Sequence, residues 1–228
     1  MRAASVATTN RRMTDSRELD VVVFGATGFT GRLAAEYLAT RAHAEGLRWA
    51  LAGRSKGKLE DVRRGLGEDA KDVPLIEARV DDPASLAKMA ARTRVLLTTV
   101  GPYAQYGDPV VDACVAEGTD YVDITGEPAF VGGVIARHHE TAKQKGLRIV
   151  SCCGFDSIPH DLGVFHAMRA LAPKGAATAE AFVRSGGGTF SGGTWHSAIG
   201  AMSRLREDRK HLAPPRAEGS RRVRGMPM

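Results

Sequence analysis

A glycine-rich turn between a short apolar run and a helical segment constrains the fold of this chain more than any other feature. The run Leu19–Phe24 (LDVVVF) is apolar and rich in β-branched residues, which is typical of a strand buried on both faces. Gly25 ends this run, and the sequence GATGFTG (25–31) leads directly into a predicted helix over 29–44. A strand, a glycine turn and a helix in this order form the phosphate-binding corner of dinucleotide-binding domains.

Each part of this turn has a physical role in holding a pyrophosphate. Glycines permit the tight turn, let the backbone approach the phosphates and let helix and strand pack closely. The start of the helix adds unpaired N–H groups and a partial positive charge. The spacing is GxxGxxG rather than GxGxxG, and a turn that serves only packing is the alternative. The residues predicted to bind the cofactor here are Gly25, Thr27, Gly28, Phe29, Thr30 and Gly31.

Five further apolar runs follow, and they alternate with segments of helical pattern. The expected strands cover 48–52, 73–80, 94–100, 121–124 and 147–152. The expected helices cover 56–66, 82–91, 108–117 and 130–145, while the first helix has Leu33, Tyr37 and Leu38 on one side. Six strands that alternate with helices predict an α/β fold, a Rossmann-type doubly wound parallel sheet over residues 18–153.

The end of the second predicted strand indicates which dinucleotide the domain prefers. An NAD-specific domain normally places Asp or Glu there, to accept a hydrogen bond from the ribose 2′-hydroxyl. The sequence LAGRS (51–55) contains no acid. Arg54 offers a guanidinium suited to a 2′-phosphate, with Ser55 and Lys58 nearby, so the sequence favours NADP(H). The alternative for Arg54 is an ordinary surface arginine at the end of a strand.

Two further positions follow predicted strands at the edge where ligands bind in open α/β sheets. Asp81 comes after the third strand, where it either meets the adenine or caps the next helix. Val100, Gly101 and Pro102 end the fourth strand. Gly101 would let the backbone pass close to the nicotinamide ribose, and a plain turn is the alternative.

Charge and cysteine content narrow the classes of partner. The net charge is +6, but residues 1–17 carry +3 and residues 200–228 carry +5, so the body between them carries −2. This distribution argues against nucleic acid as a partner of the fold. No run approaches the ~20 apolar residues of a transmembrane helix, although peripheral membrane contact stays open. Three cysteines without metal-ligand spacing predict a cytoplasmic protein with no metal site.

The two ends and the second half of the chain differ from the predicted sheet. Residues 1–17 are expected to form a disordered leader, with Met13 as an alternative start, and residues 213–228 a disordered basic tail. Residues 154–212 predict a partial second α/β domain, because 151–228 is too short for a complete one. Within it we expect a helix over 161–171, a strand over 177–184, a loop over 186–193 and a helix over 194–211.

Several motifs in this chain resemble those of the saccharopine dehydrogenase-like oxidoreductases. They are TVGPY (99–103), YGDPVV (106–111), AC (113–114), GTDYVDITGE (118–127) and CGFDSIPHDLG (153–163). The resemblance covers about residues 20–197, and the branch most like this chain comprises the trans-acting enoyl reductases of actinobacterial lipid synthesis and their animal relatives. Members of that family continue beyond the point where the basic tail begins, so the resemblance implies a C-terminally truncated member.

The resemblance implies an NADP-type Rossmann domain joined to a second α/β domain that covers the nicotinamide. It implies reduction of a conjugated double bond in an unsaturated lipid or polyketide intermediate, held by a separate polyketide synthase. Such a reduction needs a proton donor. Tyr103, Asp123, Glu127 and Asp156 lie in the motifs, but a turn, a cap or an interdomain contact explains each equally well, so the catalytic residues stay unassigned. The loop 191–194 resembles a second-domain loop of the family that faces the cofactor.

Two functions therefore remain open at the level of sequence. The first is an NADPH-dependent enoyl reductase, which truncation would leave inactive. The second is a dinucleotide-binding module without catalysis, acting as a sensor or a scaffold. A strand edge or apolar face left open by truncation would also favour self-association, so a homo-oligomer is expected.

Overall fold

The central feature of the protein is a six-stranded parallel sheet with the order β3-β2-β1-β4-β5-β6. The computed structural model describes residues 17–182, 184 and 199. The strands are β1 (Leu19–Phe24), β2 (Trp49–Gly53), β3 (Leu75–Glu77), β4 (Thr93–Thr98), β5 (Asp120–Asp123) and β6 (Ile149–Val150). The predicted doubly wound Rossmann-type sheet is confirmed, and the order reverses between β1 and β4.

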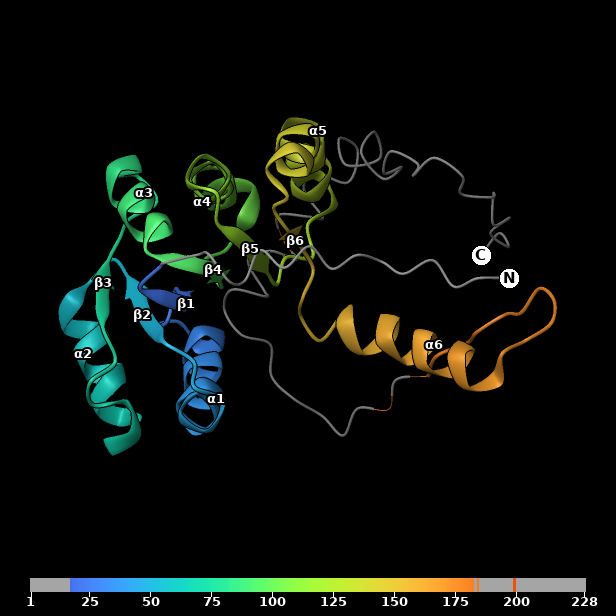
Figure 1. Ribbon diagram of the computed structural model, residues 1–228, viewed down its shortest axis with the longest axis horizontal. Coiled ribbons are helices and arrows are strands. Elements are labelled where there is room, and N and C mark those ends of the chain that lie inside the picture. Colours follow the sequence, from blue (N-terminus) through green and yellow to red (C-terminus); the bar gives the residue numbers. More distant parts are fainter. Residues whose placement is uncertain (1–16, 183, 185–198, 200–228) are drawn as a thin grey trace.

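Helices cover both faces of this sheet, as Figure 1 shows. One face carries α1 (Phe29–Glu45) and α2 (Lys56–Gly65), and the short 3-10 helix η2 (Glu68–Ala70) follows α2. The other face carries α3 (Pro83–Ala91), α4 (Tyr103–Glu117) and α5 (Pro128–Lys145). This three-layer arrangement explains why the central strands are apolar on both faces.

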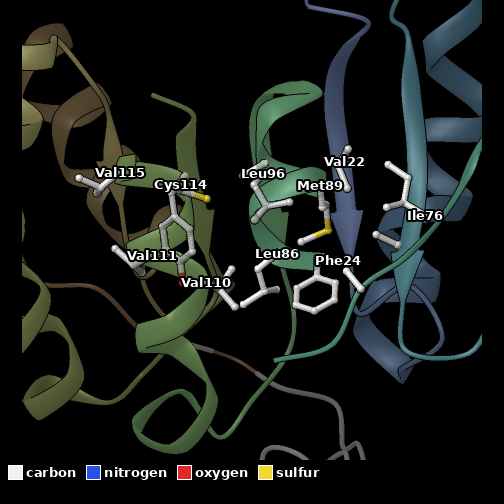
Figure 2. Close-up of a cluster of buried hydrophobic side chains, with 14 of the residues drawn as sticks. Val22, Phe24, Ile76, Leu86, Met89, Leu96, Val110, Val111, Cys114 and Val115 are labelled. Atoms are coloured by element: carbon white, nitrogen blue, oxygen red, sulfur yellow. The ribbon is translucent and has the colours of Figure 1, made fainter. Parts of the chain in front are cut away.

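The larger of two buried clusters lies between the sheet and α3, α4 and α5. Figure 2 shows side chains from β1, β3 and β4 packed against those of α3 and α4. Leu86 and Met89 of α3 and Val111 and Cys114 of α4 are fully buried there. Burying each such side chain contributes roughly 1.5–3 kcal/mol, so this cluster holds the two helices to the sheet.

The buried face of α1 is made of alanines. Ala35, Ala39 and Ala42 face the second cluster, with β2 below them. Leu33 and Tyr37, expected on one side with Leu38, are half or more exposed, and only Leu38 packs against the cluster. Small side chains let α1 lie close to the sheet, which brings its first turn near the end of β1.

Several element boundaries differ from those expected. The ladder of β3 includes only 75–77 of the predicted 73–80, and that of β6 only 149–150 of the predicted 147–152. Helix α4 begins at Tyr103 rather than at residue 108, and it contains Pro109. The early start has a long-range cause, because the Glu127 carboxylate accepts hydrogen bonds from the first backbone N–H groups of this helix.

The alternation of strands and helices stops after β6. Helix α6 (Ile158–Leu171) forms near the expected place and has no buried residue. The predicted strand over 177–184 is wrong for residues 177–182, which join no sheet and are exposed. An extended segment with no neighbouring strand to pair with forms no ladder. The expected loop over 186–193 lies outside the described residues, and so do the tail (213–228) and all but residue 199 of the helix over 194–211. Residues 1–16 of the expected disordered leader (1–17) also lie outside, but the prediction is wrong for Arg17, whose Nη2 donates to the Glu117 carbonyl at 2.7 Å.

Candidate functional site

A cleft of about 590 Å³ opens at the carboxyl edge of the sheet, at the point where the strand order reverses. The loops after β1, β2, β3 and β4 line it. Its lining residues are Phe24, Gly25, Thr27, Gly28, Gly53, Arg54, Ala78, Arg79, Val80, Asp81, Thr99, Val100, Gly101 and Tyr106. Ligands of doubly wound sheets bind at this kind of switch point. Seven of the twelve predicted cofactor residues are among the lining.

The glycines of the β1–α1 turn are there for two separate reasons. Gly25 has a φ of +91°, and a Cβ on it would lie 2.8 Å from Thr99 Oγ1 and 2.9 Å from Val100 Cγ2. A Cβ on Gly31 would collide with the carbonyl of Gly25. Gly25 thus permits the turn and Gly31 permits close packing of α1 on the end of β1. Together they leave backbone, rather than side chain, facing the cleft.

The N-terminus of α1 has no side-chain cap. Gly28 is its N-cap residue, and its first turn contains no acid. The N-termini of two neighbouring helices are satisfied from within the chain: Asp82 accepts from Ala84 N and Ser85 N in α3, and Glu127 serves α4. Helix α1 therefore presents its first N–H groups and its positive dipole end toward the cleft side, which suits a phosphate.

The residue that follows β2 is basic rather than acidic. Arg54 lines the cleft directly after Gly53, and its side chain is exposed with no ion pair to another described residue. Ser55, the next residue, is the N-cap of α2 but makes no capping bond with its side chain. The position that accepts a ribose 2′-hydroxyl in NAD-specific domains therefore holds a guanidinium.

Asp81 faces the same end of the cleft and is held by Arg79. Arg79 Nε donates to Asp81 Oδ1 at 3.0 Å, and Arg79 Nη2 donates to Asp81 Oδ2 at 2.9 Å. The Arg79 guanidinium is the main cause that lowers the pKa of the Asp81 carboxyl. The alternative that Asp81 caps the next helix is wrong, because Asp82 is the N-cap of α3. An N-cap carboxylate must reach N–H groups two and three residues ahead, and Asp82 is the residue so placed.

The loop after β4 forms the wall opposite Arg54. Val100 and Gly101 line the cleft, and the Gly101–Pro102 peptide is cis. Thr99 Oγ1 donates to the Gly25 carbonyl at 3.3 Å, which ties this loop to the glycine turn. Tyr106, in the first turn of α4, is 39% exposed and also lines the cleft.

Five predicted cofactor residues lie beside the cleft rather than in its lining. They are Phe29, Thr30 and Gly31 in the first turn of α1, Ser55 at the start of α2, and Pro102 at the start of α4. The backbone N–H groups of Phe29, Thr30 and Gly31 still point along the axis of α1. Residues that the sequence analysis missed are Arg79, Thr99 and Tyr106. No local signal marked Arg79, because it lies inside the strand expected over 73–80 and its role depends on its contact with Asp81.

Two of the motif residues with no assigned role form a buried network inside the fold. Glu127 Oε1 accepts from Tyr103 N and Oε2 from Ala104 N, both at 2.9 Å. Tyr103 Oη donates to the Thr98 carbonyl at 3.0 Å. Burial raises the pKa of Tyr103, so its proton stays on the phenol. Glu127 therefore acts as a cap for α4, and Tyr103 fastens that helix to the end of β4.

Asp123 joins the ends of β5 and β6. Its carboxylate is buried and accepts from Thr125 N, Cys152 N and Ser151 Oγ, each at 3.0 Å. Asp156 lies apart from this cluster, exposed in the turn before α6.

Among the described residues no three His, Cys, Asp or Glu side chains gather as metal ligands, and no helix is long and apolar enough to span a membrane.

The donor set of the cleft fits a phosphorylated dinucleotide. One end offers glycine backbone and a helix N-terminus without a side-chain cap, in a turn so tight that a Cβ on Gly25 or Gly31 would collide with neighbouring atoms. The other end offers the guanidinium of Arg54, which has no ion pair with another described residue. The volume of about 590 Å³ lies within the range of pockets that bury small organic ligands.

Comparison with known families gives a match over the whole sheet. The saccharopine dehydrogenase NADP binding domain matches residues 21–150, more than half of the chain. This range runs from β1 through β6 and includes every residue that lines the cleft.

The curated relatives are longer proteins. A relative from Mycobacterium tuberculosis, provisionally named a trans-acting enoyl reductase, is 47% identical over 205 residues, which are 87% of this chain and 48% of that protein. The trans-acting enoyl reductase of Mycobacterium leprae is 51% identical over 155 residues, covering 68% of this chain and 37% of that protein. The one from Mycobacterium bovis is 52% identical over 153 residues, covering 67% and 36%. The chain thus spans about half the length of the first relative and about a third of the others.

Among solved structures, the apo saccharopine dehydrogenase (L-Glu forming) of Saccharomyces cerevisiae has a similar fold. The TM-score is 0.54 with 17% sequence identity, over 68% of this chain and 31% of the yeast protein. At this identity the likeness concerns the fold alone.

Proposed function

Because this chain belongs to the saccharopine dehydrogenase NADP-binding domain family, we propose that its cleft binds NADP(H) in preference to NAD(H). The observation that carries the proposal is Arg54, which stands at the end of β2 where an NAD-specific domain places an acid. We assign residues 18–153 to the cofactor domain. Residues 154–212 we assign to part of a substrate domain.

Different residues of the chain bind different parts of the cofactor in this proposal. In the proposal, the N–H groups of the turn 25–31 and the first turn of α1 bind the pyrophosphate. Arg54 binds the 2′-phosphate with its guanidinium, and Ser55 adds a hydroxyl beside it. Val100, Gly101 and Pro102 pass along the nicotinamide ribose. When bound, NADPH supplies a hydride.

We further propose that the full reaction is reduction of a conjugated double bond in an unsaturated lipid or polyketide chain. The support is the name of the relatives, trans-acting enoyl reductases, which are 51–52% identical to this chain over 153–155 residues. The word trans-acting is consistent with an acyl substrate held by a separate polyketide synthase. We place this reaction in the cytoplasm, where the free thiols of Cys114, Cys152 and Cys153 stay reduced.

The experiment that tests this function mixes the full chain with NADPH and an α,β-unsaturated acyl thioester and follows NADPH absorbance. Loss of absorbance with formation of the saturated thioester supports the reductase. A matched reaction with NADH tests the cofactor preference. Binding of NADPH without turnover across a series of thioesters contradicts the reductase and supports a non-catalytic dinucleotide-binding module.

A further inference from the structure

One carboxylate lies in a cleft that we propose binds a dianionic 2′-phosphate. Asp81 is the one acidic residue among those that line the cleft, and it lies at the same end as Arg54. Arg54 is close enough to act electrostatically on the Asp81 carboxyl and to lower its pKa, in addition to the larger effect of Arg79. A bare carboxylate here would repel a phosphate bound by Arg54, and it would accept hydrogen bonds from ribose hydroxyls instead.

Arg79 meets this carboxylate with the matching geometry. Its Nε and Nη2 form two parallel hydrogen bonds to the two oxygens of Asp81, at 3.0 and 2.9 Å. A planar fork of this kind holds a carboxylate in one orientation. The second edge of the guanidinium, which includes Nη1, makes no hydrogen bond to another described residue. The positive charge of Arg79 thus neutralises the negative charge of the Asp81 carboxylate.

The backbone fixes Arg79 beside Arg54. Strands β2 and β3 pair in parallel with Gly53 opposite Glu77, and Ala78 N donates to the Gly53 carbonyl at 3.1 Å. Arg54 and Arg79 therefore leave neighbouring strands at one edge of the sheet. Arg79 N donates to Ser85 Oγ at 3.0 Å, which ties the loop to the first turn of α3. The pair is thus part of the wall of the cleft rather than a chance contact on a free loop.

We propose that Arg79 is a specificity-determining residue: by neutralising Asp81 it permits a 2′-phosphate to bind beside Arg54. This inference rests on the proposed binding of NADP(H). Without Arg79 the net charge of this end falls by one unit, and Asp81 becomes an acceptor for a ribose with free hydroxyls. The cleft would then lose its preference for the phosphorylated cofactor.

The test is a double-mutant cycle on the full chain, with 2′,5′-ADP and 5′-AMP as probes in isothermal titration calorimetry. We expect R79A to weaken binding of 2′,5′-ADP about tenfold, the order of effect of one unit charge near a dianion at a partly exposed site. Binding of 5′-AMP, which lacks the 2′-phosphate, should change far less. R79A/D81A should bind 2′,5′-ADP about as well as the wild type, because the carboxylate is gone as well.

The matched control is R64A, which removes the same charge from the exposed pair between Arg64 and Asp61 on α2, away from the cleft. R64A should leave both affinities unchanged. If R79A binds 2′,5′-ADP as the wild type does, or if R79A/D81A stays as weak as R79A, neutralisation of Asp81 is overturned. A wild-type chain that binds neither 2′,5′-ADP nor NADPH overturns the proposed function, and this inference with it. Circular dichroism of each variant verifies folding.

Discussion

At the scale of single residues, the cleft depends on the absence of a Cβ at residue 25 and of a carboxylate at residue 54. Gly25 has no Cβ, and any side chain there would meet Thr99 and Val100 at less than 3 Å. The residue after Gly53 has no carboxylate, and a guanidinium stands there instead. The missing Cβ lets the turn after β1 pack against the loop after β4. The missing carboxylate removes a charge that would repel a 2′-phosphate.

Replacement of Gly25 by alanine should cost more stability than the same change at another glycine of similar positive φ. Gly67 is the matched control, since its φ of +85° is close to the +91° of Gly25 but no atom lies within 4 Å of a Cβ built on it. We expect G67A to lose about 1 kcal/mol from its φ, and G25A about 3 kcal/mol from its φ and the two close contacts.

Urea unfolding of the two variants measures this difference, and titration with NADPH measures its effect on the site. G25A should bind NADPH far more weakly than G67A. Equal losses of stability at the two positions would show that Thr99 and Val100 do not press on residue 25.

Local sequence pattern predicts some of these residues and not others. The glycines and Arg54 could be predicted because strand, turn and helix follow one another along the chain. Arg79 could not, because its importance depends on pairing with Asp81 and on lying beside Arg54 across two parallel strands. The choice between Asp81 and Asp82 as the cap depends on one residue of register, which periodicity does not fix.

At the scale of elements, the helix N-termini are treated in two ways. The first N–H groups of α3 and α4 donate to the carboxylates of Asp82 and Glu127. Helix α1 has no side-chain cap and no acid in its first turn. Helix α1, which follows the glycine turn beside the cleft, therefore leaves its positive end open to a ligand.

Removal of the Glu127 carboxylate should destabilise the protein more than loss of an exposed cap. E127A leaves two N–H groups at the start of α4 without their acceptor, that of Tyr103 buried and that of Ala104 partly buried. We expect a loss of about 2–3 kcal/mol, since charged hydrogen bonds to buried groups are the stronger kind. D82A removes the exposed cap of α3 and should lose about 1 kcal/mol.

Urea unfolding at neutral pH makes this comparison. An E127A loss no larger than that of D82A would contradict the assignment of Glu127 as the buried cap of α4.

The elements that sequence predicts well are those with strong local signals. The apolar run of β1 ends at Phe24 both as expected and in the structure. The start of α4 was misplaced by five residues because Glu127, 24 residues from Tyr103, fixes it. The strand expected over 177–184 failed over 177–182 because extended propensity alone cannot supply a neighbouring strand.

At the scale of the whole molecule, ion pairs brace the edge of the sheet opposite the cleft. Asp20 Oδ1 lies 3.1 Å from Arg48 Nη2 and 3.2 Å from Arg94 Nη1, which joins the starts of β1, β2 and β4. The hydrogen bonds from Arg48 are the main cause that lowers the pKa of Asp20 from 3.8 to about 2. Ion pairs thus hold β1, β2 and β4 together at the end where they begin. At the other end these strands lead into the loops that line the cleft.

This pairing predicts how stability depends on pH. The folded pKa of Asp20 is depressed, so its contribution is full above the unfolded pKa and is lost as the pH falls from about 4 to about 2. We expect wild type to exceed D20N by about 2 kcal/mol at pH 7, with the difference gone near pH 2. D61N, in an exposed pair on α2, should differ little from wild type at any pH.

Urea unfolding of these proteins across that pH range is the measurement. A difference between wild type and D20N that stays constant from pH 7 to pH 2 would contradict the role of the Asp20 carboxylate.

At this scale, positive charge within the body of the chain is placed at one end of the cleft. Residues 18–199 carry a net −2, although the whole chain carries +6. Within that body, Arg54 and Arg79 lie together at one end of the cleft. We propose that Arg54 selects a phosphorylated dinucleotide there.

The most direct test is calorimetric titration of the full chain with NADPH and with NADH, for the wild type, R54A and R41A. Arg41, paired with Glu45 on α1, is the control for loss of one exposed arginine. We predict that wild type and R41A bind NADPH at least about tenfold more tightly than NADH, since a charge-assisted contact contributes about 1.5–3 kcal/mol. R54A should bind the two cofactors with nearly equal affinity. Equal affinities in the wild type, or an unchanged preference in R54A, would contradict the account.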